Sequence, residues 1–324
     1  MKYIGLADDK THKLPFYLAM EEYVAKHLDL DEAFFMWQVE PTVIFGRNQL
    51  IEKEVNLPYC KSKGIATYRR KSGGGCVYAD KGNIMFSYIT SSYNVANAYA
   101  CYLGKVVDAL NSLGVPAEAT GRNDITAGGK KISGNAFYHV EGKSIVHGTM
   151  LYDTDMDNMI NAITPSTVKL TSKGVDSVKG RITVLKNFLD ISIDDFKDAV
   201  REKLCDETLV LDSGAEAEIM SMERMYLSDE FIFGNNPYCN IDKEEHIDGV
   251  GNFKVLIEVK KGVIRRINLM GDFFIRGDMD ARLLNRLIGM PYNENSVRKA
   301  LEDVSVGEII LNMTNDQLIK LILI

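Results

Sequence analysis

The chain has 324 residues, of which 46% are hydrophobic and 26% are charged, and its formal net charge is −7 at pH 7. This composition is typical of a soluble globular protein, and the length favours one large domain plus a small one. An acidic chain is a poor partner for nucleic acid, so we expect no nucleic-acid function.

Membrane and secretory signals are missing from the sequence as well. No apolar run approaches the roughly 18 residues that a membrane-spanning helix needs, and the first residues contain no signal-peptide region. The five cysteines are scattered, odd in number and without CxxC spacing. This pattern fits reduced cysteines better than disulfides or a zinc site, so we expect a cytoplasmic protein with no membrane partner.

Hydrophobic periodicity outlines the N-terminal elements. Apolar residues at three- and four-residue spacing predict an amphipathic helix over residues 15–28, with Pro15 in its first turn. The clearest helix is predicted over residues 94–113, and Gly114 and Pro116 end it. β-branched and aromatic residues predict strands at 33–39, 42–46, 65–70 and 83–89.

The run 68–78, between the last two of these strands, contains three consecutive glycines. Because glycine has no Cβ, the N–H groups of such a run can approach a ligand closely. Arg69 and Arg70 add permanently charged donors that suit a carboxylate or a phosphate. Taken alone, the triple glycine is about equally compatible with a hinge between two strands.

Residues 121–151 predict a meander of antiparallel strands, with turns at 128–129 and 141–143. Its strands carry unusually many polar groups for segments that should be half-buried. Farther on, residues 171–181 predict a polar loop, and Ser192 with Asp195 predicts the beginning of a helix.

A domain boundary is predicted near residues 233–238. Beyond it, alternating residues predict a strand over 253–259 and a partner strand over 263–269. Amphipathic segments at 281–288, 296–301 and 316–323 complete a small α+β unit. We therefore expect two domains, residues 1–240 and 241–324, with every motif for ligand contact in the first.

Several ordered motifs resemble the lipoate–protein ligase A family, within the biotin/lipoate protein ligase superfamily. The run 69–83 resembles its lipoate-binding signature, and the tail, including 271–274, resembles its accessory domain. Its other motifs are matched at residues 18–22, 41–47, 121–124, 131–136, 147–149 and 173–178. The resemblance covers nearly the whole chain. It implies an α+β fold: a biotin/lipoyl ligase-like catalytic domain of mixed, largely antiparallel sheets flanked by helices, with a small C-terminal α+β accessory domain.

The resemblance implies an ATP-dependent lipoate–protein ligase. Such an enzyme activates lipoate to lipoyl-AMP and transfers the lipoyl group to a lysine of a lipoyl-acceptor domain. The implied cofactors are ATP and Mg²⁺, and lipoate or octanoate is the acyl substrate. The implied acceptors are 2-oxoacid dehydrogenase E2 subunits and the glycine cleavage H protein, and we expect a monomer. A carboxylate that attacks an α-phosphate needs fixed positive charge and N–H donors to offset the repulsion between two anions.

The same resemblance implies roles for individual residues. Lys131 is the implied catalytic residue, between the lipoyl carboxyl group and the α-phosphate, and Asp124 is the implied Mg²⁺ ligand, helped by Asn123. The implied substrate- and nucleotide-binding residues are Arg70, Ser72, Gly73, Gly74, Gly75, Cys76, Val77, Tyr78, Asn83, Asn123, Lys131, Ser133, Gly134 and His147.

Simpler roles stay open for several of these residues. Lys131 could be a solvated strand lysine, Asp124 could cap a turn, and His147 could be a core histidine that orients two strands. Two departures from the family pattern also stand out. Ala79 replaces a common histidine, and Cys76 stands where a small residue is usual.

The main alternative function is an ATP-independent octanoyl or lipoyl transferase on the same scaffold, which needs a cysteine nucleophile. We expect that cysteine a little upstream of the motif lysine, and residues 117–124 contain none. A biotin ligase should carry a different arginine–glycine loop. A silent lipoyl-binding protein would release no pyrophosphate from ATP.

Overall fold

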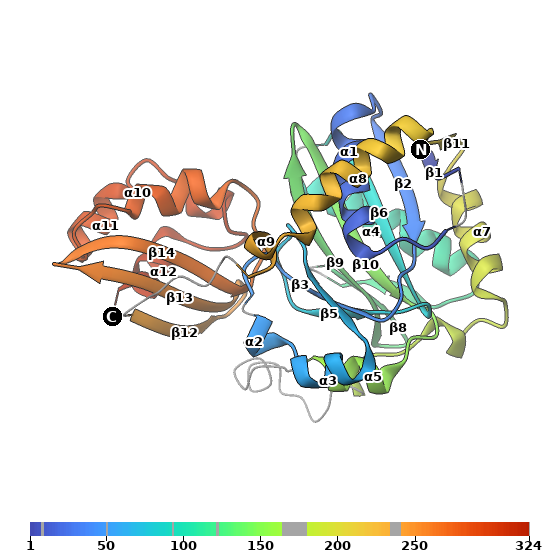
Figure 1. Cartoon of the computed structure of the whole chain (residues 1–324), viewed down its shortest axis with the longest axis horizontal. Coiled ribbons are helices and arrows are strands. Elements are labelled where there is room, and N and C mark those ends of the chain that lie inside the picture. The colour runs from blue at the N-terminus through green and yellow to red at the C-terminus, as the bar shows by residue number, and fades with distance from the viewer. Residues whose placement is uncertain are drawn as a thin grey trace.

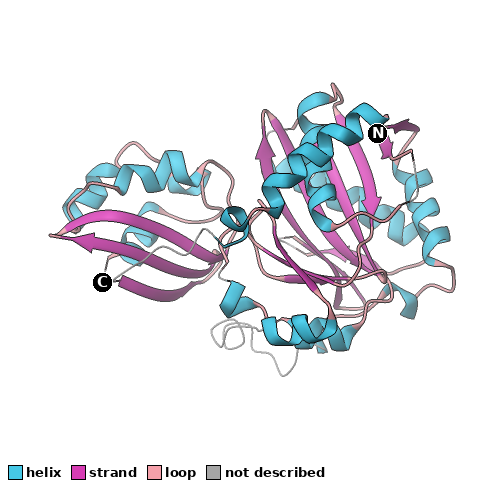
Figure 2. Cartoon of the chain, in the orientation of Figure 1, coloured by secondary structure: helices cyan, strands magenta, loops and turns pink. Residues whose placement is uncertain are grey.

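The computed structural model describes residues 1–7, 10–49, 51–92, 94–120, 123–163, 180–233 and 241–323. Figure 1 shows a larger lobe that contains the N-terminus and a smaller lobe formed by the C-terminal part of the chain. Helices lie against the faces of sheets in both lobes, so the fold is α+β as predicted (Figure 2). None of the described helices is long and apolar enough to cross a membrane.

An eight-stranded sheet forms the centre of the larger lobe. Its first three strands pair in parallel and the remaining neighbours pair antiparallel. The meander predicted over residues 121–151 is confirmed as the antiparallel strands β8, β9 and β10. In spatial order the strands are β11 (Glu207–Val210), β1 (Lys2–Gly5), β2 (Glu32–Trp37), β6 (Asn83–Thr90), β10 (Lys143–Leu151), β9 (Lys130–Val140), β8 (Asp124–Ala127) and β7 (Ala117–Ala119).

The two faces of this sheet pack against different helices, because successive side chains of a strand point to opposite faces. On β2, Phe35 and Trp37 belong to the core shared with α1 and α8, whereas Phe34 belongs to the core shared with α4 and α7. Figure 1 shows α1 and α8 side by side over the first of these faces. The four helices are α1 (Leu14–His27), α4 (Val95–Ser112), α7 (Ile193–Leu204) and α8 (Ser213–Leu227).

A second, three-stranded sheet places the glycine run. Its central strand β3 (Thr42–Phe45) is parallel to β4 (Ala66–Arg69) and antiparallel to β5 (Val77–Ala79). Residues 70–76 connect the two outer strands and therefore cross the end of the central one. Short helices accompany this sheet: α2 (Ile51–Glu54), α3 (Leu57–Lys63), α5 (Met156–Ala162) and α9 (Asp229–Phe233). The 3₁₀ turn η2 (Leu185–Asn187) instead buries Leu185 in the core shared with α4 and α7.

Most of the predicted helices and strands of the larger lobe are confirmed. The predicted helices at 15–28 and 94–113 are α1 and α4, and Ser192 and Asp195 form a reciprocal capping box at the start of α7. The predicted strands at 33–39 and 42–46 are β2 and β3, although they belong to different sheets. Residues 171–179 and 234–238 of the predicted loop and boundary lie outside the described residues.

The smaller lobe has its own sheet and its own core. Strands β12 (Ile241–Ile247), β13 (Gly251–Lys260) and β14 (Val263–Asp272) form an antiparallel sheet. Among the described residues, its hydrophobic cluster shares no side chain with the clusters of the larger lobe. The sequence did not predict β12, because this edge strand alternates charged residues with partly buried ones and carries little apolar signal.

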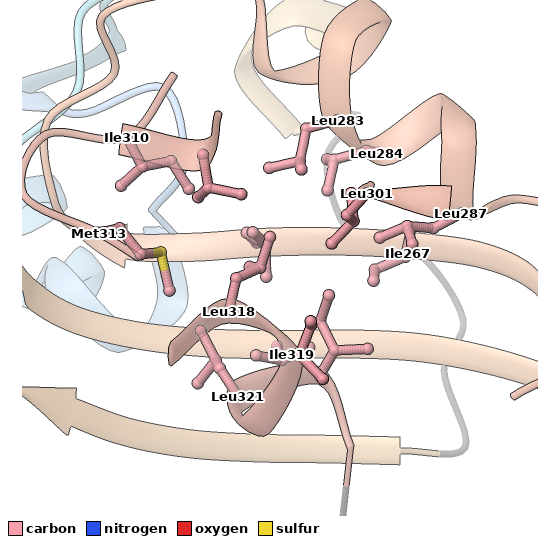
Figure 3. Close-up of a cluster of buried hydrophobic side chains, with 14 of the residues drawn as sticks. Ile267, Leu283, Leu284, Leu287, Leu301, Ile310, Met313, Leu318, Ile319 and Leu321 are labelled. Carbon is pink, nitrogen blue, oxygen red and sulfur yellow. The ribbon is translucent and has the colours of Figure 1, made fainter. Parts of the chain in front are cut away.

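Helices cover one face of this small sheet. The predicted amphipathic segments are confirmed, and Figure 3 shows their leucines and isoleucines, including Leu283, Leu301 and Leu318, gathered over the strands. The elements are the π-helical turn η3 (Asp280–Leu284), α10 (Asn285–Leu287), α11 (Glu294–Ala300), η4 (Val306–Glu308) and α12 (Asn315–Ile322).

The separate core of the small lobe can be tested with Leu318→Ala. Leu318 is fully buried, and removing its side chain should cost about 2–5 kcal/mol of stability, because the cavity collapses only partly. Hydrogen exchange should therefore become faster in β12–β14 and stay unchanged in β6 and β10. Met290→Ala, at a partly exposed position, is the control. Equal loss of protection in both sheets would contradict a separate core.

Candidate active site

A cavity of about 910 Å³ lies between the glycine run, the meander and the smaller lobe. Apolar side chains from α1, β2 and β6 line part of it, among them Leu18, Trp37 and Met85. A second apolar part includes Leu151 and Met159. Charged side chains of both lobes line the cavity too, and its size is in the range of small-ligand sites.

Lys131, the catalytic residue that the family resemblance implied, lines this cavity. It lies on β9, and its Nζ is 2.8 Å from Asp124 Oδ1 on the neighbouring strand β8. A Cβ at Gly134 would lie 2.6 Å from Lys131 Nζ, so a larger residue there would displace the lysine from its position beside Asp124. Both partners are partly exposed and line the cavity. Lys131 therefore faces the cavity, beside a carboxylate, and is not simply a solvated strand lysine.

Arg70 gives the glycine run its shape. Its buried guanidinium donates to the carbonyl oxygens of Gly73 (2.6 Å) and Gly75 (2.7 Å) within the run. It also donates to Ile44 O at 3.1 Å and to Ser72 Oγ at 2.9 Å. Burial lowers the pKa of Arg70 to about 10, which still leaves it charged at neutral pH. Arg70 lines the cavity, but most of its donors hold the protein's own carbonyl groups.

The candidate binding residues divide into two groups. The cavity wall includes Arg70, Gly74, Gly75, Cys76, Val77, Tyr78, Asn123, Asp124, Lys131, Gly134 and His147. Ser72, Gly73, Asn83 and Ser133 lie behind this wall, and their contacts are with protein. Asn83, for example, donates to Tyr78 O and accepts from Met150 N–H, so it ties three strands together. The structure thus brings eleven of the residues to one cavity and places the other four as its support.

His147 lines the cavity and also contacts the residues behind its wall. It is almost fully buried, its Nε2 lies 2.6 Å from Ser72 Oγ, and its Nδ1 lies 2.9 Å from Glu21 Oε2. It nevertheless lines the cavity. The expectation of a satisfied core histidine and the expectation of a ligand-facing one are therefore compatible with one geometry.

A Mg²⁺ site was expected at Asp124. Among the described residues, no three His, Cys, Asp or Glu side chains form a ready metal-binding group. Protein Mg²⁺ is commonly held by one or two carboxylates together with substrate phosphates, so such a group is not required. The side-chain oxygens of Asn123 and Asp124 at the cavity wall fit that chemistry.

Sequence reasoning missed three features of the site. Asn135 lines the cavity, and its buried Oδ1 has no hydrogen-bond partner among the described residues. It lies in the motif at residues 131–136 that the resemblance covers, but no role was assigned to it there. Glu21 was noted only as part of an N-terminal motif. Asp272 comes from the smaller lobe, and no local pattern could have placed it near residue 75.

The smaller lobe forms part of the cavity wall, although the sequence predicted every motif for ligand contact in residues 1–240. Its Asn252, Asp272 and Phe274 line the cavity. The backbone of the lobe holds the glycine run directly, because Gly74 N–H donates to Phe273 O at 3.2 Å. At the edge, the Gly271 N–H donates to Asn48 O, and Arg47 pairs with Asp280 at 2.5 Å.

The fold and the cavity define an α+β protein with a partly apolar cavity, of small-ligand size, beside a lysine–carboxylate pair. Residues 14–205 match the lipoyl protein ligase A/B catalytic domain, and residues 236–322 match the C-terminus of bacterial lipoate protein ligases. Lipoate–protein ligase 1 of Staphylococcus aureus is 35% identical, and the match covers 94% of this chain and 95% of that protein. The chain therefore belongs to the lipoate–protein ligase family.

Solved structures agree with this assignment. A lipoate–protein ligase A bound with ATP is 27% identical, with a TM-score of 0.62 over 72% of this chain and 98% of its own. A bipartite lipoate protein ligase of Thermoplasma acidophilum, described with its E2 lipoyl domain, is 25% identical. Its TM-score is 0.64, over 74% of this chain and 98% of its own.

The contact between the lobes can be tested with Gly73→Ala. A Cβ at this position would lie 2.6 Å from the Phe273 carbonyl oxygen, and a backbone oxygen cannot rotate away. The small lobe should therefore loosen from the glycine run, and the amides of Gly74 and Gly271 should exchange faster with solvent. Gly104→Ala is the control, because its Cβ would meet no atom within 4 Å. Unchanged exchange at both amides would contradict the contact.

Proposed function

We propose that this protein is an ATP-dependent lipoate–protein ligase. It joins lipoate and ATP to form lipoyl-AMP and pyrophosphate, and it then transfers the lipoyl group to a lysine of an acceptor domain. The observation that carries this proposal is the Lys131–Asp124 pair, beside the arginine-framed glycine run, in one cavity of a family member. The relative bound with ATP supports the nucleotide requirement.

In the first step a carboxylate oxygen of lipoate attacks the α-phosphorus of ATP, and pyrophosphate leaves. We assign to Lys131 the role of offsetting the negative charge that gathers between the two anions. Asp124 Oδ1 holds the Lys131 ammonium at 2.8 Å and so fixes its position. Mg²⁺ held by Asp124 and Asn123 would supply further positive charge at the phosphates.

The second step releases AMP when the acceptor lysine attacks the acyl carbon. An acyl-adenylate hydrolyses if water reaches it, so the site has to exclude water. The smaller lobe, which lies on the glycine run and lines the cavity, is suited to this task. We propose that residues 1–240 form the catalytic domain and residues 241–324 this accessory domain.

Binding of the acyl chain follows from the apolar lining. The walls formed by Leu18, Trp37 and Met85 suit an aliphatic chain, because burying methylene groups is favourable by about 0.8 kcal/mol each. The remaining cavity-lining candidates, from Gly74 to Tyr78 with Asn123, Gly134 and His147, then surround the carboxyl end and the nucleotide. Ser72, Gly73, Asn83 and Ser133 act by supporting them.

The acceptor is proposed to be a lipoyl-bearing domain, as in 2-oxoacid dehydrogenase E2 subunits or the glycine cleavage H protein. The archaeal relative described with its E2 lipoyl domain supports the first of these. We also propose that the protein acts as a cytoplasmic monomer. The transferase alternative is not favoured, because relatives that match nearly the whole chain are named ligases, and a solved lipoate–protein ligase A that covers 72% of this chain is bound with ATP.

Lys131→Met tests the proposed chemistry. The partly exposed lysine contributes little to the core, so the protein should fold, whereas loss of one preorganised charge should lower the adenylation rate about 10²–10³-fold. ATP-dependent release of pyrophosphate with free lipoate is the measurement. Lys130→Met, at the exposed neighbouring position, should keep the full rate. A wild-type rate for Lys131→Met would remove this residue from the mechanism.

A further inference from the structure

Helix α1 carries two consecutive buried carboxylates, Glu21 and Glu22, at 0% and 3% exposure. A buried carboxylate is costly unless it is paired and hydrogen-bonded, so both groups need an explanation. The described cavity wall includes neither of them. Their hydrogen-bond partners instead lead to the segment 70–75, the loop that contains the glycine run.

Glu22 reaches this loop directly. Its Oε1 is 2.6 Å from the Nζ of Lys71, which lies between Arg70 and Ser72 in the chain. Tyr226 of α8 donates its hydroxyl to the same carboxylate oxygen, and the Lys71 ammonium lies 5.2 Å from the centre of the Tyr226 ring. The loop is thus tied to α1 and α8 through one half-buried lysine.

Glu21 reaches the loop through a chain of three hydrogen bonds. The carboxylate can only accept, so His147 Nδ1–H donates to it at 2.9 Å. At the other end, the Arg70 guanidinium can only donate, so its Nε–H donates to Ser72 Oγ at 2.9 Å. The Ser72 hydroxyl hydrogen is then free to donate to His147 Nε2 at 2.6 Å. All three donors point the same way, an order in which each bond strengthens the next.

This Ser–His–Glu order resembles a hydrolytic triad, but the surroundings exclude that role for Ser72. Its side chain is fully buried, it lies behind the described cavity wall, and its oxygen already accepts from Arg70. A nucleophile has to reach the substrate carbonyl. The chain therefore orients groups and transfers no acyl group.

We propose that Glu21 and Glu22 are positioning residues that fix the conformation of the loop 70–75. Glu21 acts through His147, Ser72 and Arg70, and Glu22 acts through Lys71. The consequence for ligand binding rests on the proposed function, because the loop faces the site of the acyl carboxylate and the nucleotide. Two independent ties from one helix keep the loop in its binding conformation before any ligand arrives.

Hydrogen exchange of Glu21→Gln tests the first tie without depending on activity. Losing the carboxylate charge weakens its hydrogen bond to His147, so amides of residues 70–76 should exchange about tenfold faster. Amides of β6 and β10 should not change. In steady-state adenylation, the KM for ATP and for lipoate should rise about tenfold, and kcat should change less.

Tyr138→Phe is the matched control. The Tyr138 hydroxyl donates to the same carboxylate at 3.2 Å, but it is not part of the chain to Ser72. Both loop exchange and KM should therefore stay within about twofold of the wild-type values. A Tyr138→Phe effect as large as that of Glu21→Gln would show that any partner of Glu21 matters equally. That result would contradict a specific role for the hydrogen bonds from Glu21 through His147 to Ser72.

Lys71→Met tests the second tie, and it covers the case in which Glu21→Gln does not fold. Lys71 is half-buried and methionine retains much of its apolar length, so the variant should fold and still show faster exchange in the loop. Wild-type loop exchange in every variant that folds, with only a lower melting temperature, would overturn the proposal. If the protein does not ligate lipoate at all, the exchange result still decides this inference and only the KM measurement is lost.

Discussion

The site depends on burying one positive charge, the guanidinium of Arg70, inside a loop that satisfies it. An isolated buried charge would be prohibitive, and here four acceptors surround it, two of them carbonyl groups of the glycine run. Those carbonyl groups turn inward toward the arginine. Arg70 also lines the cavity, so the side chain that shapes the loop adds a positive charge to the cavity wall. The buried Arg70 guanidinium therefore determines both the conformation of the loop and part of its charge.

The remaining parts of the molecule hold this loop from different sides. The three-stranded sheet fixes its two ends, helix α1 holds its first residues through buried carboxylates, and the smaller lobe packs on its glycines. A Cβ at Gly73 would meet the smaller lobe, and a Cβ at Gly134 would meet Lys131. Glycines at these positions serve close packing between neighbouring parts of the protein, in addition to giving a ligand access to the backbone.

Much of this could be predicted from the sequence, because the signals are local. Periodicity located α1 and α4, the turn residues located the meander, and the family motifs located Lys131, Asp124 and nine further residues of the cavity wall. The network behind the wall could not be predicted in this way. The ties from Glu21 to His147 and from Gly74 to Phe273 join residues more than a hundred positions apart, and only tertiary packing brings them together.

The most direct test of the account is mass spectrometry of an apo lipoyl domain after incubation with the full-length protein, ATP, Mg²⁺ and lipoate. The account predicts that the acceptor lysine gains one lipoyl group, that it gains none when ATP is left out, and that modification is about 10²–10³-fold slower when Lys131→Met replaces the wild-type protein. Modification that proceeds equally well without ATP from a preformed acyl-carrier thioester, or no modification with all components present, would contradict it.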